Sequence, residues 1–283
     1  MHLRNLGIGA VVILTLTGLL AGAQAQTPKS AVPDSAILGI KLAGHRAVYD
    51  LALAKSDAGS VGQMRGRLVL EFRDVCEGYT LTQRFRTEMV DNDGDSHNAE
   101  FSITSWESRD GLKYRFNLKH DSEGEPTEEY VGRADIGARG GSGKATFSKP
   151  QGLEIAMPKG TIYPSEHLAM LIRDAKAGKT FLAAKVFDGS GDDGVFEVSA
   201  AIGRAQSVSD SVRPLLSPLK GVQSWNVRLA YFPTKEKAEK PQYEIAFRLF
   251  ANGVSDDLLM DYGDYALKGQ LTAFELFPAA ECQ

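Results

Sequence analysis

Apolar and polar residues alternate along much of this chain of 283 residues. The stretch GLKYRFNLK, residues 111–119, places Leu, Tyr, Phe and Leu at every second position, with Lys, Arg and Asn between them. The same alternation recurs over residues 46–53, 65–72 and 242–250. A period of two places successive side chains on opposite faces of a β-strand, one face buried and the other in water. This pattern is typical of antiparallel sheets.

Further strands are predicted between short polar or glycine-bearing turns, as hairpins require. They cover residues 79–90, 98–108, 144–149, 152–157, 180–187, 195–202, 224–232 and 267–276. The pattern predicts about a dozen strands or more in a mainly β fold. No proline-, serine- or glycine-rich run divides the chain beyond its first residues, so we expect a single domain over residues 37–283. Its antiparallel sheet either closes around side chains or stays half open as a barrel around space for a ligand.

One segment departs from the period of two. Residues 163–179, YPSEHLAMLIRDAKAGK, carry apolar side chains at helical spacing, which predicts one prominent helix. Pro164 and Ser165 mark its start, and Glu166 suits the positive end of the helix dipole. Gly178 marks its end. We expect Ser165 to cap the helix.

The start of the chain predicts export. Residues 1–25 begin with a basic residue, continue as an uncharged apolar run and end in AQA, the small-x-small pattern at which signal peptidase cuts. We predict a signal peptide over residues 1–25, cleavage before Gln26, and a flexible polar leader over residues 26–36. A retained membrane anchor is the alternative, but the apolar run is shorter than the roughly 20 residues of a span. We therefore expect no transmembrane span in the mature chain.

Export leaves a mildly acidic mature chain. The full sequence has 32 Lys and Arg against 36 Asp and Glu, a formal net charge of −4. Cleavage before Gln26 removes Arg4 and no acidic residue, so the mature charge becomes −5. An acidic chain is unsuited to binding nucleic acid or an anionic membrane surface. We therefore expect no nucleic-acid partner.

The chain has two cysteines, Cys76 and Cys282, and the second lies next to the last residue. Thiols oxidise outside the cytosol, and an even count suggests a pair. Two cysteines alone do not make a zinc cage, and no Cys-x-x-Cys motif suggests redox catalysis. We expect a Cys76–Cys282 disulfide that holds the C-terminus to the early part of the domain. Two unpaired structural thiols are the alternative.

The acidic stretch DNDGDSHNAE suggests a calcium site at first sight, with Asp91, Asp93 and Asp95 at alternate positions. An EF-hand loop, however, needs Gly at its sixth position and Glu at its twelfth, where this chain has Ser96 and Ser102. A tight Asn/Asp/Gly turn between strands explains the same residues. We assign no metal ligand, and the role of the turn stays open.

No catalytic or cofactor-binding set emerges from the sequence. GARGGSGKA, residues 137–145, lacks the first glycine and the hydroxyl residue of a phosphate-binding loop. Ser165, Glu166 and His167 are residue types used in hydrolysis, yet consecutive helical residues point about 100° apart. The chain contains no GxSxG elbow. We assign no catalytic residue and no cofactor; His167 and His45 are either buried polar groups or general bases.

Three stretches together resemble the EipB family of periplasmic cell-envelope integrity proteins of Alphaproteobacteria. They are LAGHRAVYDLAL at residues 42–53, YPSEHLAMLI at 163–172, and SDDLLMDYGDYALKGQLTAFEL at 255–276. The resemblance extends over residues 37–283. It implies a β-spiral, a curved and mostly antiparallel sheet with one prominent helix. It also implies a disulfide between Cys76 and Cys282, a periplasmic location, and no established catalytic residue.

These observations favour a non-enzymatic periplasmic protein that supports envelope integrity as a binding or scaffold module. A carrier of lipid or lipoprotein acyl chains in a half-open β cavity is the alternative. A hydrolase acting on an envelope polymer, with His167 and Glu166 as its candidate residues, is the third interpretation. The expected partner is an unidentified envelope protein or lipid.

Overall fold

The computed structural model describes residues 38–57, 61–91, 94–191, 194–207, 213–235 and 238–282. The predicted signal peptide and leader, residues 1–25 and 26–36, lie outside these described residues. The strands are β1 His45–Ser56, β2 Gln63–Asp74, β3 Gly78–Val90, β4 Ser96–Ser108, β5 Lys113–Ser122, β6 Glu125–Ile136, β7 Gly143–Lys149, β8 Glu154–Met157, β9 Thr161–Ile162, β10 Phe181–Phe187, β11 Val195–Ile202, β12 Gln206–Ser207, β13 Gln223–Pro233, β14 Tyr243–Phe250, β15 Ser255–Asp261 and β16 Tyr265–Leu276. The helices are α1, Pro164–Lys176, and a short 3-10 helix, η1, Pro214–Leu219.

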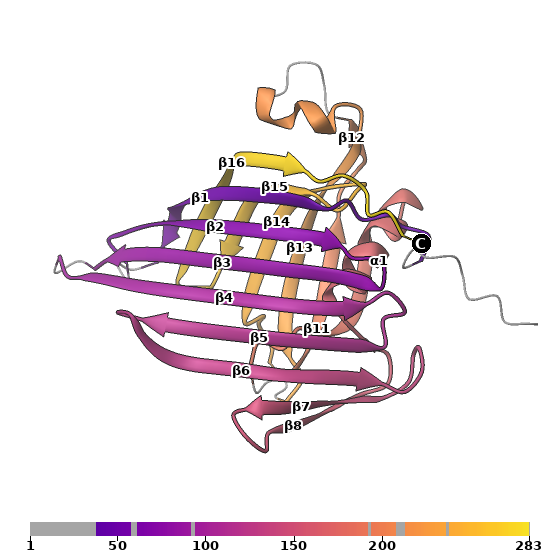
Figure 1. Cartoon of the computed structure of the whole chain (residues 1–283). Helices are drawn as coiled ribbons and strands as arrows, with labels where there is room; N and C mark the ends of the chain where they lie inside the picture. Colours follow the sequence, from indigo (N-terminus) through magenta and orange to yellow (C-terminus); the bar gives the residue numbers. More distant parts are fainter. Residues whose placement is uncertain are drawn as a thin grey trace, which may run out of the picture. The chain divides into compact units, whose positions relative to one another are not determined.

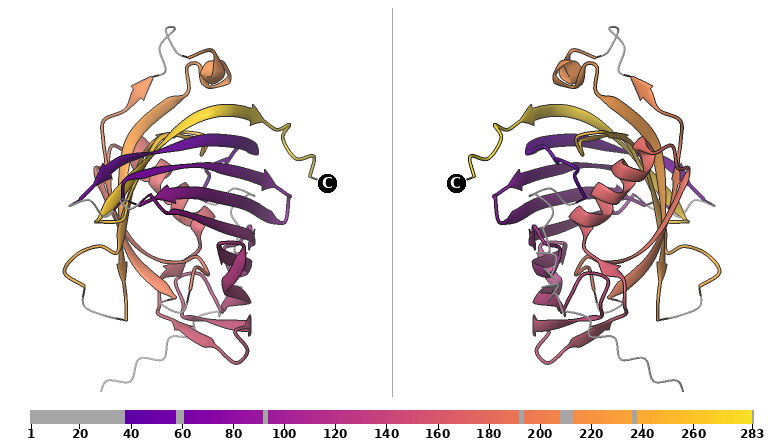
Figure 2. Two further views of the ribbon diagram at one scale, coloured as in Figure 1. Left: turned by 90° about the vertical axis from the view of Figure 1, so that its left-hand side faces the viewer. Right: turned by 90° about the vertical axis from the view of Figure 1, so that its right-hand side faces the viewer.

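The sixteen strands of the described chain belong to one sheet (Figure 1). Its order is β8-β7-β6-β5-β4-β3-β2-β1-β16-β15-β14-β13-β11-β10-β9, and β12 pairs with β13 beside this path. The short parallel pair of β9 and β10 interrupts an otherwise antiparallel order. Figure 2 shows the sheet curled so that α1 lies inside its curve. The predicted mainly β, barrel-like fold with one prominent helix is confirmed.

The first and last strands of the described chain lie side by side. β1 pairs with β16 from His45 opposite Leu276 to Ser56 opposite Tyr265. β1 also pairs with β2, so it joins the two halves of the sheet. The edges of the sheet are therefore at β8 and β9, which follow one another in sequence.

The alternation pattern does not predict β6 or β15. β6 begins with Glu-Pro-Thr-Glu-Glu and is held by pairing with β5 and β7. β15 carries Asp256 at a fully buried position, where its carboxylate accepts hydrogen bonds from Arg213 at 2.7 Å and Arg248 at 2.8 Å. A buried carboxylate needs such partners because desolvating an unpaired charge costs several kcal/mol. Contacts with other parts of the fold therefore stabilise both strands: neighbouring strands in the case of β6, and ion pairs to Asp256 in the case of β15.

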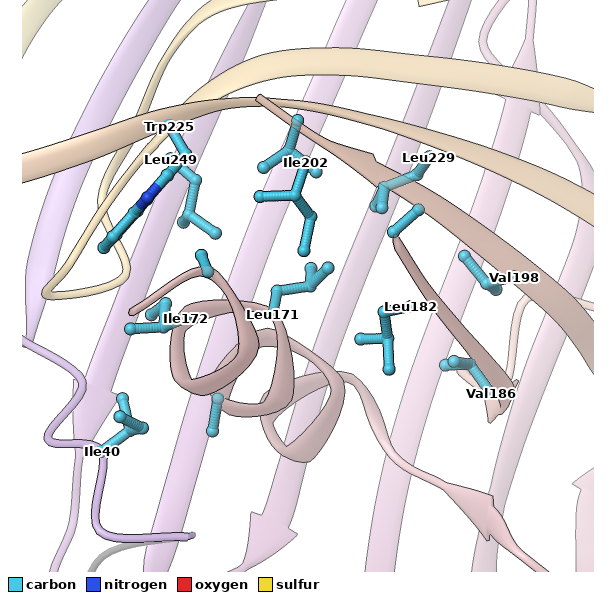
Figure 3. Close-up of a cluster of buried hydrophobic side chains, with 14 of the residues drawn as sticks. Ile40, Leu171, Ile172, Leu182, Val186, Val198, Ile202, Trp225, Leu229 and Leu249 are labelled. Carbon is cyan, nitrogen blue, oxygen red and sulfur yellow. The ribbon is translucent and has the colours of Figure 1, made fainter. Parts of the chain in front are cut away.

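Helix α1 packs against the C-terminal strands of the sheet. Its Leu171 and Ile172 share a buried cluster with Leu182 of β10, Ile202 of β11 and Trp225 of β13 (Figure 3). Burying one such aliphatic side chain contributes roughly 1.5–3 kcal/mol. The apolar face predicted from the helical spacing thus lies against the sheet, and it fills this part of the interior.

The N-terminus of α1 is capped from another strand, so the expected cap by Ser165 is wrong. The N-cap residue is Tyr163, whose side chain makes no capping hydrogen bond. The carboxylate of Glu107, on β4, instead accepts hydrogen bonds from the backbone N–H groups of Ser165 at 2.7 Å and Glu166 at 3.1 Å. These are among the orphan donors of the first helical turn. Glu107 therefore fixes the helix start against the sheet.

Burial gives Glu107 an unusual ionisation. Its side chain is withdrawn from solvent, and this desolvation raises its pKa to about 7, although the two helix N–H groups favour the charged form. Between the ordinary Glu pKa of 4.5 and about 7, the folded protein retains a proton that the unfolded chain releases. The free energy of unfolding contributed by this group therefore decreases as pH rises through this window.

Cys76 and Cys282 form a disulfide, with their Cα atoms 5.5 Å apart and 206 residues apart in sequence. Cys76 lies in the turn between β2 and β3 with a left-handed backbone, φ 64°, and its N–H donates to Asp74 at 2.9 Å. The C-terminal tail is also held by the Phe277 N–H, which donates to the Gly44 carbonyl at 2.8 Å. The tail is therefore held at both of its ends.

We expect Cys282→Ser to lower the melting temperature measured without reductant. In the chain-entropy model a loop of this length contributes about 5 kcal/mol, an upper figure, and each kcal/mol shifts the midpoint by about 2–4 °C in a domain of this size. The measurement is thermal unfolding followed by circular dichroism. Wild-type protein in dithiothreitol is the control and should melt with the variant. Equal melting of the variant and the oxidised wild type would contradict the prediction.

Glu107→Gln should become more stable relative to the wild type as pH rises from 5 to 8. Glutamine imitates the protonated acid, whereas the wild type must ionise a buried group, a difference on the order of 3 kcal/mol across the window. The measurement is the melting temperature of both proteins in one series of buffers. Titrating groups common to both chains, including His45 and His167, cancel in the difference. A difference that does not change with pH would show that Glu107 is ionised throughout.

Candidate ligand-binding cavity

Antiparallel pairing sorts the hairpin turns to the two ends of the strands. The turns joining β2 to β3, β4 to β5, β6 to β7 and β14 to β15 lie at the end that carries Cys76, which we call the disulfide end. The turns joining β1 to β2, β3 to β4, β5 to β6, β7 to β8, β10 to β11, β13 to β14 and β15 to β16 lie at the other, which we call the cavity end. In Figure 1 the label α1 stands near the C-terminus, toward the disulfide end.

A cavity of about 850 Å³ occupies the interior toward the cavity end. One wall comes from β3, β4 and β5, and the facing wall from β11, β13, β14 and β15. Pro164, the first residue of α1, also lines it. The volume lies within the range of about 300–1,000 Å³ that is typical of small-molecule sites.

The lining of this cavity is mainly apolar and has a polar rim. Leu81, Phe85, Ile103, Leu118, Phe196, Ile245 and Met260 are among the apolar side chains that line it. Four exposed lining residues lie within the first four residues of β4 and β6 or just before β14; they are His97, Asn98, Glu128 and Gln242. Apolar walls with a few polar groups are the usual composition of a ligand site.

Four tyrosines of the cavity lining form a row across the C-terminal strands. The rings of Tyr231 and Tyr243 stack with their centroids 4.4 Å apart, and those of Tyr262 and Tyr265 with theirs 5.2 Å apart. The Tyr243 and Tyr262 centroids, 6.3 Å apart, connect the two pairs. The row gives one side of the cavity an aromatic wall.

Asp188 places a carboxylate in the same lining, from the turn between β10 and β11. The turn is held by the Tyr114 hydroxyl, which donates to the Asp188 carbonyl at 3.1 Å, and by the Ser190 N–H, which donates to the carboxylate at 2.9 Å. Gly189 has φ 76°, and a Cβ there would lie 2.6 Å from the ring of Phe116, so the turn requires glycine. Burial raises the pKa of the Asp188 carboxyl. The sequence gives no local signal for this placement.

A smaller cavity of about 150 Å³ borders the large one and shares Leu81, Tyr114 and Pro164 with it. His45 and Glu107 line it. The Nδ1 atom of His45 lies 2.8 Å from the Ala43 carbonyl, and burial lowers the pKa of this imidazole. The His45 ring is thus buried, with a hydrogen-bond partner at one of its two nitrogens.

The three hydrolase candidates on α1 do not converge. Glu166 pairs with Arg139, and burial raises its pKa. His167 is buried, which lowers its pKa to about 4, and its Nε2 has no hydrogen-bond partner among the described residues. The backbone N–H of Ser165 is occupied by Glu107. None of the three candidates lines the 850 Å³ cavity.

The acidic stretch at the cavity end forms a turn. The Asp95 N–H donates to the Asp91 carboxylate at 2.9 Å, and the Asp91 N–H donates to the Asp95 carbonyl at 3.0 Å. The His97 Nε2 lies 3.6 Å from the Asp91 carboxylate, whereas Asp93 is outside the described residues. Within the described ranges no group of three or more His, Cys, Asp or Glu side chains is arranged to hold a metal ion.

Sequence reasoning missed Glu107 and Asp188. The sequence did contain a signal for Glu107, because it lies on the same face of β4 as Ile103 and Ser105, and that face is buried. An acidic residue at an inward position marks a buried polar contact. Asp188 lies in a turn, where an acidic residue is ordinary, so its place in the cavity depends on how the sheet curls.

The comparisons with known proteins agree over most of the chain. The EipB-like family profile matches residues 37–278. The cell envelope integrity protein EipB of Brucella abortus (strain 2308) is 34% identical over 247 residues, which cover 86% of this chain and 87% of that protein. A crystal structure of a β-barrel-like protein from Brucella abortus, described as a domain of unknown function, superposes with a TM-score of 0.77 at 33% identity. It covers 84% of this chain and 100% of that one.

Among the described residues, no helix has the length and apolar character required to cross a membrane. The profile match over residues 37–278 includes all sixteen strands of the described chain and α1. This chain therefore belongs to the EipB-like family.

Proposed function

We propose that this protein is a non-enzymatic module that supports cell-envelope integrity by binding an envelope ligand or partner. The observation that carries this proposal is the 850 Å³ cavity between the two walls of the sheet. The Brucella relative is named for cell envelope integrity, and that name describes a cellular role and no reaction. A ligand site inside a half-open sheet gives such a role a physical basis.

The side chains around the cavity support binding over catalysis. Hydrolysis needs a nucleophile, a base and an orienting group in hydrogen-bond contact. Glu166 is in an ion pair with Arg139, and neither Glu166 nor His167 lines the cavity. Glu107 is engaged with the start of α1. These groups stabilise the fold, and the cavity wall is left mainly apolar.

A second candidate, a carrier of lipid or lipoprotein acyl chains, is favoured by the composition of the same cavity. Its deep wall is apolar, with Leu118 and Ile103 almost withdrawn from solvent, whereas the rim is polar. Apolar surface of this kind gains free energy when it is covered by a hydrocarbon chain. A protein partner that meets the rim and a lipid that enters the cavity are both compatible with the module.

The proposal includes export to the periplasm, with cleavage before Gln26. The disulfide between Cys76 and Cys282 supports it, because structural disulfides persist in oxidising compartments. The predicted signal peptide supplies the route.

Native mass spectrometry of the protein isolated from its own periplasm, without reductant, tests the proposal. We expect a chain that starts at Gln26, is oxidised at both cysteines, and carries a small-molecule adduct. Ala99→Trp should lose the adduct, because Ala99 lines the cavity and the indole would occupy its space. Ala52→Trp is the matched control, since Ala52 is exposed on β1 and does not line the cavity.

An unprocessed or fully reduced chain would contradict export. An adduct that persists in Ala99→Trp would place the binding site elsewhere on the protein. A bare, oxidised wild type would remove the carrier function and leave only a scaffold that meets protein partners.

A further inference from the structure

The two ends of the sheet differ in charge. In the described parts of the hairpin turns, the cavity end has seven acidic side chains against two basic ones, and the disulfide end has two of each. The acidic residues at the cavity end are Asp57, Asp91, Asp95, Glu123, Asp188, Glu239 and Asp264, and the basic ones are Lys235 and Lys240. Lys55, at the end of β1, pairs with Asp57 at 3.0 Å, and the remaining turns at this end still carry an excess of acidic side chains. Such an excess attracts cations and repels anions.

The cavity lining has the same sign. Glu128 and Asp188 are its carboxylates, and no Lys or Arg is among its residues in the described chain. His97 and His120 lie near the rim, and the His120 Nδ1 is 3.2 Å from the Thr127 hydroxyl. An anionic headgroup would meet no lysine or arginine here, although these are the residues that proteins use to bind phosphate or carboxylate.

Among the described residues the Asp188 carboxylate has no cationic partner, and it shares its cavity with the tyrosine row. Its carboxylate accepts a hydrogen bond from the Ser190 N–H at 2.9 Å. Asp188, Tyr231 and Tyr243 line the same cavity. Burial raises the pKa of both tyrosines, and the charge of Asp188 raises these pKa values further. A cation in this place would supply the missing counter-charge and would contact the π systems of the tyrosine row.

An apolar body must accompany that cation. Most of the wall between the rim and α1 is aliphatic or aromatic, including Leu118 and Phe196. A small hydrated cation would leave this wall without a partner, whereas an amphiphile would cover it. The volume of about 850 Å³ suits one ligand of drug-like size.

We propose that the cavity binds a positively charged amphiphile, whose ammonium group lies between Asp188 and the tyrosine row and whose apolar chain covers the aliphatic wall. This inference rests on the proposed binding function and adds the chemical class of the ligand. The acidic turns at the cavity end steer the cation, and the same charges exclude anionic amphiphiles.

The test is displacement of the fluorescent probe N-phenyl-1-naphthylamine from the purified mature protein. The competitors are dodecylamine, dodecanol and laurate, which share one chain length and differ in charge, each below its aggregation concentration. We expect dodecylamine to displace the probe at a concentration about tenfold lower than laurate does, with dodecanol between them. Added salt should reduce the contribution of the acidic rim.

Asp188→Asn should remove most of this preference for the amine and leave displacement by dodecanol unchanged. Glu128→Gln, at an exposed position, should reduce the preference to a smaller extent and does not endanger folding. Glu77→Gln is the matched control, an exposed acid at the disulfide end, and should bind all three competitors as the wild type does. Ala99→Trp should lose the probe itself.

The outcomes separate the two proposals. Absence of probe binding to the wild type, or unchanged probe binding to Ala99→Trp, would overturn the binding function and this inference with it. Probe binding that Ala99→Trp abolishes, combined with equal displacement by the amine and laurate, would overturn the cationic class alone. A preference for the amine that survives in both Asp188→Asn and Glu128→Gln would overturn the assignment of these carboxylates.

Discussion

The pairing of β1 with β16 is the contact on which the rest of the structure depends. It places the first strand of the described chain beside the last and joins β1–β8 to β9–β16 in one continuous sheet. Without it, each half would be an open sheet with an unpaired edge and one apolar face in water. With it, the sheet curls and its inward residues from both halves meet. β1 and β16 are far apart in the chain, so bringing them together costs conformational entropy. The contacts formed between the two halves of the sheet must offset that cost.

The interior that results is filled unequally. Toward the disulfide end, α1 packs Leu171 and Ile172 against the C-terminal strands, and Glu107 holds the start of the helix. Toward the cavity end no second helix enters the described structure, and the space between the walls stays open. The disulfide also holds the C-terminal tail at the end where α1 packs. The other end is free to accept a ligand without disturbing the packed core.

Binding by such an end is consistent with membership of a family whose Brucella member is named for envelope integrity. In the proposed binding function, charge selects among ligands of similar shape. An apolar wall accepts many hydrocarbon ligands, and fixed charges at the rim and at Asp188 select among them. Because the cavity lining offers two carboxylates and, within the described chain, neither lysine nor arginine, this selection works by excluding anions as well as by attracting cations.

The sequence by itself determined the class of fold, the position of α1 and the pairing partners available to the two cysteines. Those features are local: a period of two, a helical spacing, and an even count of thiols. The tertiary structure decided β6, β15, the cap on α1 and the cavity. Each depends on residues far apart in the chain, as Glu107 does when it meets the amides of Ser165 and Glu166. A local pattern shows which face of a strand is buried, whereas the partner of that face and the space left beside it are set by the curl of the whole sheet.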